Sequence, residues 1–229
     1  MKTDRILIVA AHPDDEVLGC GGTIARLATE GAAVTILILA NGLSSRPDFD
    51  PVRDAPLMKL HHERAQRAGA LLGAREVVLA GFPDQKMDTV PLLDITQTIE
   101  REIARVQPEI VFTQHGGDLN QDHVLTFRAT LAATRPMAGH PVRRVYAYEV
   151  GSSTEWAFQQ FEPVFRPQVF FDITAHLETK IAAMQVYESE ARAFPHPRSP
   201  EAQRAQAQRW GSTVGVHAAE AFACIRDLR

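Results

Sequence analysis

The segment AHPDDEVLGCGG, residues 11–22, places a histidine, a proline and three consecutive acids directly after the apolar run RILIVA. Neighbouring carboxylates repel one another, so this cluster requires a compensating charge, and a bound cation would supply one. His12 and Asp15 lie three residues apart across a turn that Pro13 helps to fix. Their side chains can therefore converge on a single point.

A second polar segment, HGGDLNQDH at residues 115–123, follows another apolar run and ends in His123. Two imidazoles and one carboxylate form the ligand set of many catalytic zinc sites, which keep a fourth position for water. We therefore predict that His12, Asp15 and His123 bind one Zn2+ per chain, or another divalent transition metal. Zinc lowers the pKa of its bound water to about 7, which makes that water a usable nucleophile at neutral pH.

The residues beside these ligands are suited to proton transfer. Asp14 adjoins a predicted ligand without being needed as one, so it is the predicted general base for the attacking water. Asp122 precedes His123 and is a candidate to orient an imidazole from outside the ligand set. A leaving amine also needs a proton donor, for which His115 and His217 are the candidates.

Simpler explanations exist for the same pattern. Acids that follow a strand often complement a helix dipole, and His-x-x-Asp alone is a weak metal signature. The glycines at 19–22 lack the G-x-G-x-x-G spacing, so no nucleotide cofactor is predicted. Five further histidines are interpreted as structural or surface residues: His61, His62, His140, His176 and His196.

The elements that must position these residues alternate along the chain. Apolar runs rich in β-branched or aromatic residues predict strands at 5–10, 33–40, 76–81, 109–114, 143–150 and 168–173. Amphipathic segments predict helices at 22–31, 92–106 and 173–191, and loops are expected at 41–56, 114–122 and 192–212. This alternation predicts an α/β fold with a mostly parallel sheet and helices on both faces. Loops that follow parallel strands share one edge of the sheet, so the two polar segments should meet there.

Composition limits the remaining classes of protein. The length of 229 residues suits a single domain, and a net charge of −4 disfavours a nucleic-acid partner. Cys20 and Cys224 are too few for a disulfide framework. No segment has the roughly 18 apolar residues of a membrane span, and no signal peptide is evident, so a cytoplasmic location is expected. The sequence leaves open whether the chain forms a homo-oligomer.

Four ordered segments together resemble the LmbE-like, or PIG-L, family of zinc-dependent N-deacetylases. They are AHPDDEVLGCGG, HGGDLNQDH, DITAHLETKIAAMQVYES at 172–189 and GVHAAEAFACIR at 215–226. The resemblance runs almost end to end and implies one Rossmann-like LmbE-like domain over residues 1–229. It also implies removal of an N-acetyl group from a small-molecule glucosamine-type sugar or sugar conjugate. The family pattern gives the same metal ligands and the same general base, Asp14.

The chain also departs from the family pattern. Many members have a histidine three residues before the last ligand, whereas this chain has Asn120. An asparagine can donate a hydrogen bond to an oxyanion but cannot act as a general acid, so the acid role falls to His115 or His217. Asp84 matches a family aspartate that is interpreted as a sugar contact. The predicted substrate contacts are Asp84, Arg53 and Asp118.

Three other functions remain open at this level. A metal-dependent nucleotide-sugar glycosyltransferase is disfavoured because His12 and His123 suit zinc better than magnesium, which prefers oxygen ligands. A non-catalytic binding module is disfavoured because the three ligands and the base are all present. An amidase that acts on a non-acetyl N-acylated small molecule is the third. Four residues of the later segments are expected to organise the fold: Lys180, Tyr187, Glu220 and Phe222.

Overall fold

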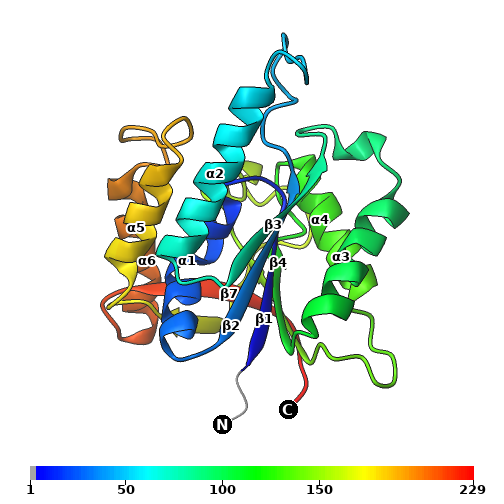
Figure 1. Cartoon of the computed structure of the whole chain (residues 1–229). Coiled ribbons are helices and arrows are strands. Elements are labelled where there is room, and N and C mark those ends of the chain that lie inside the picture. The colour runs from blue at the N-terminus through cyan, green and yellow to red at the C-terminus, as the bar shows by residue number, and fades with distance from the viewer. Residues whose placement is uncertain (1–3) are drawn as a thin grey trace.

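A seven-stranded sheet forms the centre of the molecule, and the computed structural model describes residues 4–229 (Figure 1). The strands are β1 (Arg5–Ala10), β2 (Ala33–Ala40), β3 (Glu76–Phe82), β4 (Ile110–Gln114), β5 (Arg144–Tyr148), β6 (Val169–Asp172) and β7 (Ala219–Asp227). Their order is β3-β2-β1-β4-β5-β7-β6. The strands from β3 to β5 pair in parallel, and β7 runs antiparallel to both β5 and β6. The predicted mostly parallel sheet is thus confirmed.

Helices cover both faces of this sheet, as expected. The helices are α1 (Asp15–Thr29), α2 (Ala55–Leu71), α3 (Leu92–Val106), α4 (Gln121–Ala133), α5 (Leu177–Val186) and α6 (Pro200–Val214), with short 3-10 helices η1 (Met87–Thr89) and η2 (Glu155–Ala157). Helices α1, α2 and α5 share a core with Ile6 and Ile8 of β1. Helices α3 and α4, on the right in Figure 1, share a second core with Leu7 and Val9. Because β1 is covered on both sides, its run of apolar residues is continuous.

The chain reverses its winding direction between the two central strands. From β1 it passes through α1 to β2 on one side, and from β4 it passes through α4 to β5 on the other. The loops that follow β1 and β4 therefore border one crevice at the carboxyl ends of the strands, which is where open α/β sheets bind ligands.

The sequence-based prediction is wrong for one helix and for the length of another. The sequence predicts a loop at 192–212, but α6 occupies Pro200–Val214, where the Ser199 side chain caps the N–H of Ala202 at 3.1 Å and Gly215 ends the helix with a φ of 79°. A proline in the first turn and a glycine past the end are ordinary helix boundaries, which the polar composition obscures. The predicted helix over 173–191 is shorter, at Leu177–Val186.

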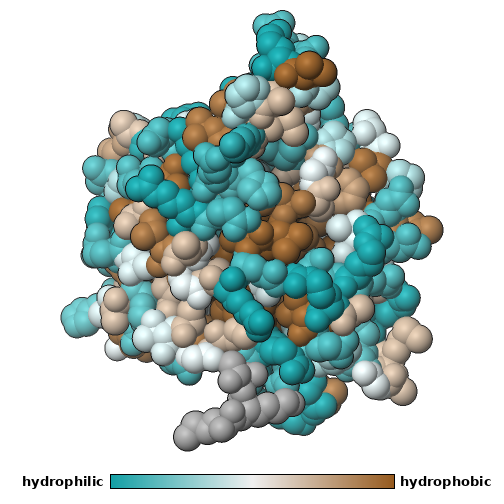
Figure 2. All heavy atoms as spheres, viewed as in Figure 1, coloured by the Kyte–Doolittle hydropathy of each residue, from teal (hydrophilic) through white to brown (hydrophobic). Residues whose placement is uncertain are grey.

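The surface seen in Figure 2 is largely hydrophilic, with apolar residues gathered near the centre of this face. Met58 of α2 and Leu79 of the edge strand β3 line an apolar cavity of about 420 Å³. Within residues 4–229, no helix is both long and apolar enough to cross a lipid bilayer.

A buried ion pair between Lys180 and Glu220 binds the backbone of α1 where the helix is kinked. Cys20 departs from helical geometry, with a φ of −146°, so nearby backbone groups lose their partners within the helix. The Lys180 ammonium donates to the Leu18 carbonyl at 2.8 Å and pairs with Glu220 at 2.6 Å. Glu220 also accepts the N–H groups of residues 22 and 23, at 3.0 and 2.6 Å. The pair thereby satisfies the backbone of the break, in line with the expected structural role of both residues.

Replacing Lys180 by methionine is expected to lower the free energy of unfolding by about 3–5 kcal/mol, because Glu220 would remain buried without its counter-charge. Urea unfolding of the purified variant measures this loss. Arg204→Met is the matched control, since its ion pair with Glu178 joins α5 and α6 at the surface. That exposed pair should contribute no more than about 1 kcal/mol. Equal losses in the two variants would contradict the interpretation.

Candidate metal centre and active site

The loop between β1 and α1 directs its acids to different partners. The backbone N–H of His12 donates to Asp15 Oδ2 at 2.8 Å, which fixes Asp15 in the first turn of α1. Asp14 has a φ of 115°, which residues other than glycine rarely adopt. Its N–H donates to Glu16 Oε2 at 3.1 Å, and the Tyr187 hydroxyl donates to Glu16 Oε1 at 2.6 Å. These bonds hold the unusual backbone conformation in place.

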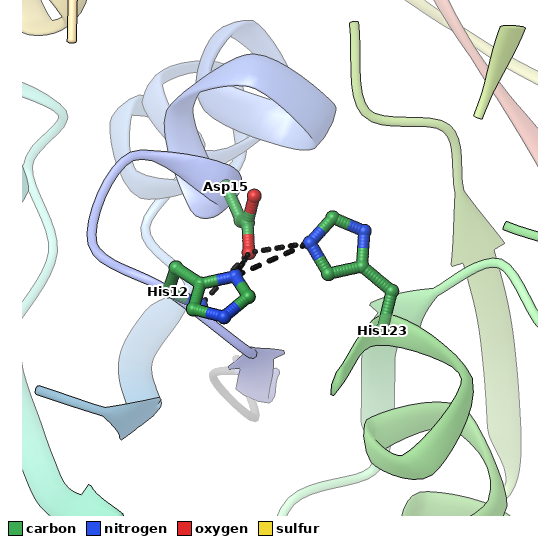
Figure 3. Close-up of side chains that lie close together, drawn as sticks. All are labelled: His12, Asp15 and His123. Carbon is green, nitrogen blue, oxygen red and sulfur yellow. Dashed lines mark hydrogen bonds and ion pairs between the residues drawn. The ribbon is translucent and has the colours of Figure 1, made fainter. Parts of the chain in front are cut away.

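His12, just before α1, Asp15 in its first turn and His123 in the first turn of α4 converge on one point, although the two segments lie more than a hundred residues apart (Figure 3). His12 Nδ1, His123 Nε2 and Asp15 Oδ2 lie 3.3 Å from one another in all three pairings. Four ligands at zinc bond lengths around a tetrahedral ion are separated by about 3.3 Å. The donor types and their spacing therefore fit a zinc ion.

Each imidazole is oriented by a carboxylate on its far side. His12 Nε2 lies 3.0 Å from Asp122 Oδ2 and 3.3 Å from Asp84 Oδ1. His123 Nδ1 lies 3.2 Å from Asp118 Oδ2. Such carboxylates fix the ring so that its other nitrogen faces a metal. The structure thus places Asp122 where a group that orients an imidazole is expected.

His12, Asp84 and Asp122 also lie close enough together to suggest a second cation site. However, Asp122 already accepts the backbone N–H groups of Gln85 at 2.8 Å and Met87 at 3.1 Å. A carboxylate that accepts these bonds is suited to receive the ring N–H of His12 as well. We therefore interpret Asp84 and Asp122 as residues that orient His12, not as ligands of a second cation.

Both imidazoles are in an environment that favours positive charge. Burial lowers the pKa of His12, but Asp122, Asp15 and Asp84 outweigh burial and raise it to about 10. Burial likewise opposes protonation of His123, yet Asp15 and Asp118 raise its pKa to about 9. A site that stabilises two imidazolium ions will also stabilise a divalent cation, which must displace those protons when it binds.

Metal-free protein should become less stable as the pH rises through about 9 and 10. Both histidines have pKa values in the folded protein that lie above the unfolded value of about 6.5. Their protonated forms therefore stabilise the fold fully below about pH 6.5, and this stabilisation is lost as the pH rises through the folded-state pKa values. Urea unfolding of chelator-treated protein between pH 7 and 10 measures the change. His123→Gln should make the dependence shallower, and an equal dependence in both proteins would count against the assignment.

The carboxylate of Asp14 lies beside the triad of His12, Asp15 and His123 but is not one of its three donors. Asp14 is 2% exposed, and burial together with Asp15, Glu190 and Glu16 raises its pKa well above the usual range, against the opposing effect of Arg198. Arg198 Nη1 donates to Asp14 Oδ2 at 2.8 Å. A buried acid with a raised pKa beside a metal site is a candidate for proton transfer.

A polar pocket of about 230 Å³ opens onto these groups. Asp84 and Asn120, both predicted residues of the site, line it. The Asn120 Oδ1 accepts the N–H of Asp122 at 2.9 Å and caps α4, which leaves the amide NH2 group as its donor. Asp84 accepts the Ser45 hydroxyl at 2.6 Å.

The structure does not bring the two predicted acid histidines to the pocket. His115 Nε2 lies 2.6 Å from the Pro163 carbonyl, its ring packs edge-on against Phe165, and burial lowers its pKa. His217 is exposed just before β7, on the side of Asp172. Neither histidine lines the pocket, so the structure does not bring either of them to the other predicted site residues.

Two predicted substrate contacts, Arg53 and Asp118, also lie outside the pocket. Arg53 lies in an exposed loop and pairs with Asp54 at 2.8 Å. Asp118 is 3% exposed and accepts the hydroxyls of Ser153 and Thr154 while it orients His123. Neither residue lines the pocket. The sequence pattern does not distinguish a carboxylate beside a ligand from one facing the substrate.

Sequence reasoning missed several residues of the site. Gln114, the last residue of β4, donates to Asp15 Oδ2 at 2.8 Å. Arg46, His61, Glu190 and Arg198 line the pocket. The position of Gln114 at the carboxyl end of a strand was the one available signal for it. Arg198 lies in a proline-rich segment without periodicity, which gave no signal at all.

The fold and the triad together define an α/β protein with a two-histidine, one-carboxylate centre at the switch point of its sheet. Residues 7–134 match the PIG-L family, described as GlcNAc-PI de-N-acetylase. This match covers more than half of the chain and includes both polar loops, so the chain belongs to the PIG-L family.

Individual relatives extend the likeness beyond that region. The chain is 30% identical to the "Uncharacterized deacetylase YaiS" of Escherichia coli, over 82% of this chain and 92% of that protein. It is 33% identical to the 1D-myo-inositol 2-acetamido-2-deoxy-alpha-D-glucopyranoside deacetylase of Nakamurella multipartita, over 62% of this chain and 58% of that protein. Among solved structures, the conserved protein TT1542 of Thermus thermophilus is 27% identical, with a TM-score of 0.77, and the match covers 98% of this chain and 96% of that one.

Proposed function

We propose that the protein is a zinc-dependent hydrolase that removes an N-acetyl group from a glucosamine-type sugar or sugar conjugate. The single observation that carries the proposal is the triad, in which three donor atoms lie 3.3 Å apart and both histidines line a polar pocket. Membership of the PIG-L family and the N-acetylated sugar named for the Nakamurella relative support the substrate class.

His12, Asp15 and His123 would hold the metal, which fits their spacing and donor types. When bound, zinc would polarise the acyl carbonyl and lower the pKa of a coordinated water. Asp14 then accepts a proton from the attacking water, for which its raised pKa suits it. Asn120, on the wall of the same pocket, donates its amide N–H to the developing oxyanion.

The leaving amine must receive a proton as the C–N bond breaks. His115 and His217 lie outside the pocket, so we assign this step to Asp14, which lines the pocket and returns the proton that it has taken from water. The products are then acetate and the free amine. Asp84 and His61, which line the same pocket, are suited to bind sugar hydroxyl groups.

A panel of N-acetylated sugars tests the proposal: free, nucleotide-linked and glycoside-linked. Zinc-loaded protein should release acetate and a primary amine in equal amounts from at least one of them. Glycosyl transfer in the presence of magnesium, without amine release, would instead favour the glycosyltransferase. Release of a longer acyl group but not of acetate would favour the general amidase.

Replacing Asp118 by asparagine is expected to weaken zinc binding about 10- to 100-fold, because the carboxylate that orients His123 would become neutral. Competition with a chromophoric chelator measures the affinity. His217→Gln is the control, since that side chain is exposed and outside the pocket, and it should bind zinc like the wild type. Unchanged affinity in the Asp118 variant would remove this carboxylate from the centre.

A further inference from the structure

One arginine connects the proposed base to a distant part of the chain. Arg198 lies in the segment between α5 and α6, and its Nη1 donates to Asp14 Oδ2 at 2.8 Å and to Glu190 Oε2 at 3.0 Å. Its Nε donates to the Ser152 hydroxyl at 2.8 Å. The side chain is 23% exposed and lines the pocket. Arg198 is thus fixed by three acceptors at the wall of the active site.

The segment that carries Arg198 is held at both ends. Tyr187, directly after α5, donates its hydroxyl to Glu16 at 2.6 Å. Gln203 of α6 donates to the backbone carbonyl of Arg198 at 2.9 Å, and Ser199 caps the same helix. The guanidinium group is therefore placed by the start of α6 rather than by a free loop.

Asp14 depends on this guanidinium group for its orientation. Within residues 4–229, the one hydrogen bond of the Asp14 carboxylate to a side chain is the bond to Arg198. After Arg198, the charged groups with the largest effect on Asp14 are acids: Asp15, Glu16 and Glu190. Without Arg198, repulsion from these acids would turn the Asp14 carboxylate away from its observed position.

We propose that Arg198 is a positioning residue, which holds the Asp14 carboxylate towards the pocket for proton transfer. This inference rests on the proposed function. It gives the segment 187–199 a role in the reaction. A lysine would not replace the arginine fully, because a single ammonium group cannot reproduce the fork geometry that reaches Asp14, Glu190 and Ser152 together.

Steady-state kinetics of zinc-loaded Arg198→Ala test the proposal. We expect kcat to fall about 10- to 100-fold while KM changes less than about threefold, because the base is misplaced and the substrate contacts are kept. The kcat of Arg198→Lys should lie between those of the wild type and Arg198→Ala. Millimolar guanidinium chloride should restore part of kcat in Arg198→Ala, whereas sodium chloride at the same ionic strength should not.

Arg192→Ala is the matched control, because Arg192 lies in the same segment and, among residues 4–229, bonds only to the carbonyls of Ser189 and Ala191. It should retain wild-type kcat. A rise in KM with unchanged kcat in Arg198→Ala would overturn the proposal in favour of a substrate contact. Loss of bound zinc would overturn it in favour of a structural role, and wild-type kcat would leave the residue without a role.

A crystal structure of metal-free Arg198→Ala provides a readout that does not depend on activity. The Asp14 carboxylate should leave its present position there and keep it in Arg192→Ala. If the carboxylate stays in place in both, the positioning role is wrong. If wild-type protein releases no acetate from any substrate, the proposed function fails instead, and the crystal comparison still decides whether Arg198 orients Asp14.

Discussion

Replacing Asp14 by asparagine is expected to lower kcat about 100- to 10,000-fold while the bound zinc is retained. The amide has nearly the shape of the carboxylate but cannot accept a proton from water at neutral pH. Asp14 is not one of the three convergent donors, so its loss leaves His12, Asp15 and His123 intact. Acetate release and zinc content, measured on the same preparation, separate the two effects.

Asparagine is a better choice than alanine at this position. Asp14 has a φ of 115°, and asparagine tolerates positive φ values far more readily than alanine does. Asp94→Asn is the control, since Asp94 is an exposed acid of α3. It should retain full activity. Full activity in the Asp14 variant with one zinc per chain would show that another group takes the proton.

The central part of the fold was predictable because its residues carry strong patterns. β1, β2 and β4 are buried on both faces, and their apolar runs are continuous. The antiparallel strand β7 was missed because its second half is largely exposed and carries polar residues. α6 was missed because its polar residues and the prolines before it resemble a loop, although Ser199, Pro200 and Gly215 mark its ends.

The candidate site was predictable only as far as sequence spacing fixes distance. His12 and Asp15 share one turn, and the shared edge of a parallel sheet brings His123 to them. Spacing could not show that Asp118 lies behind His123, since that depends on the bonds from Ser153 and Thr154. The partners of a carboxylate across the fold are set by tertiary packing, which short motifs do not record.

His123→Ala is expected to lose the metal itself. Removal of one imidazole leaves His12 and Asp15 as the two remaining donors of the triad, too few to close a stable zinc site. The variant should contain less than about a tenth of the wild-type zinc after dialysis against a weak chelator, and acetate release should fall to background. Elemental analysis of the dialysed protein measures the first quantity directly.

His61→Ala separates loss of the metal from general damage to the pocket. His61 lines the same pocket, is 4% exposed and lies outside the triad, so this variant should keep one zinc per chain even if its KM rises. The expected zinc contents of His123→Ala and His61→Ala are thus opposite, although both residues line the same pocket. If both keep zinc, the cation is held by other residues, and the 3.3 Å spacing of the three donors has a purely structural origin.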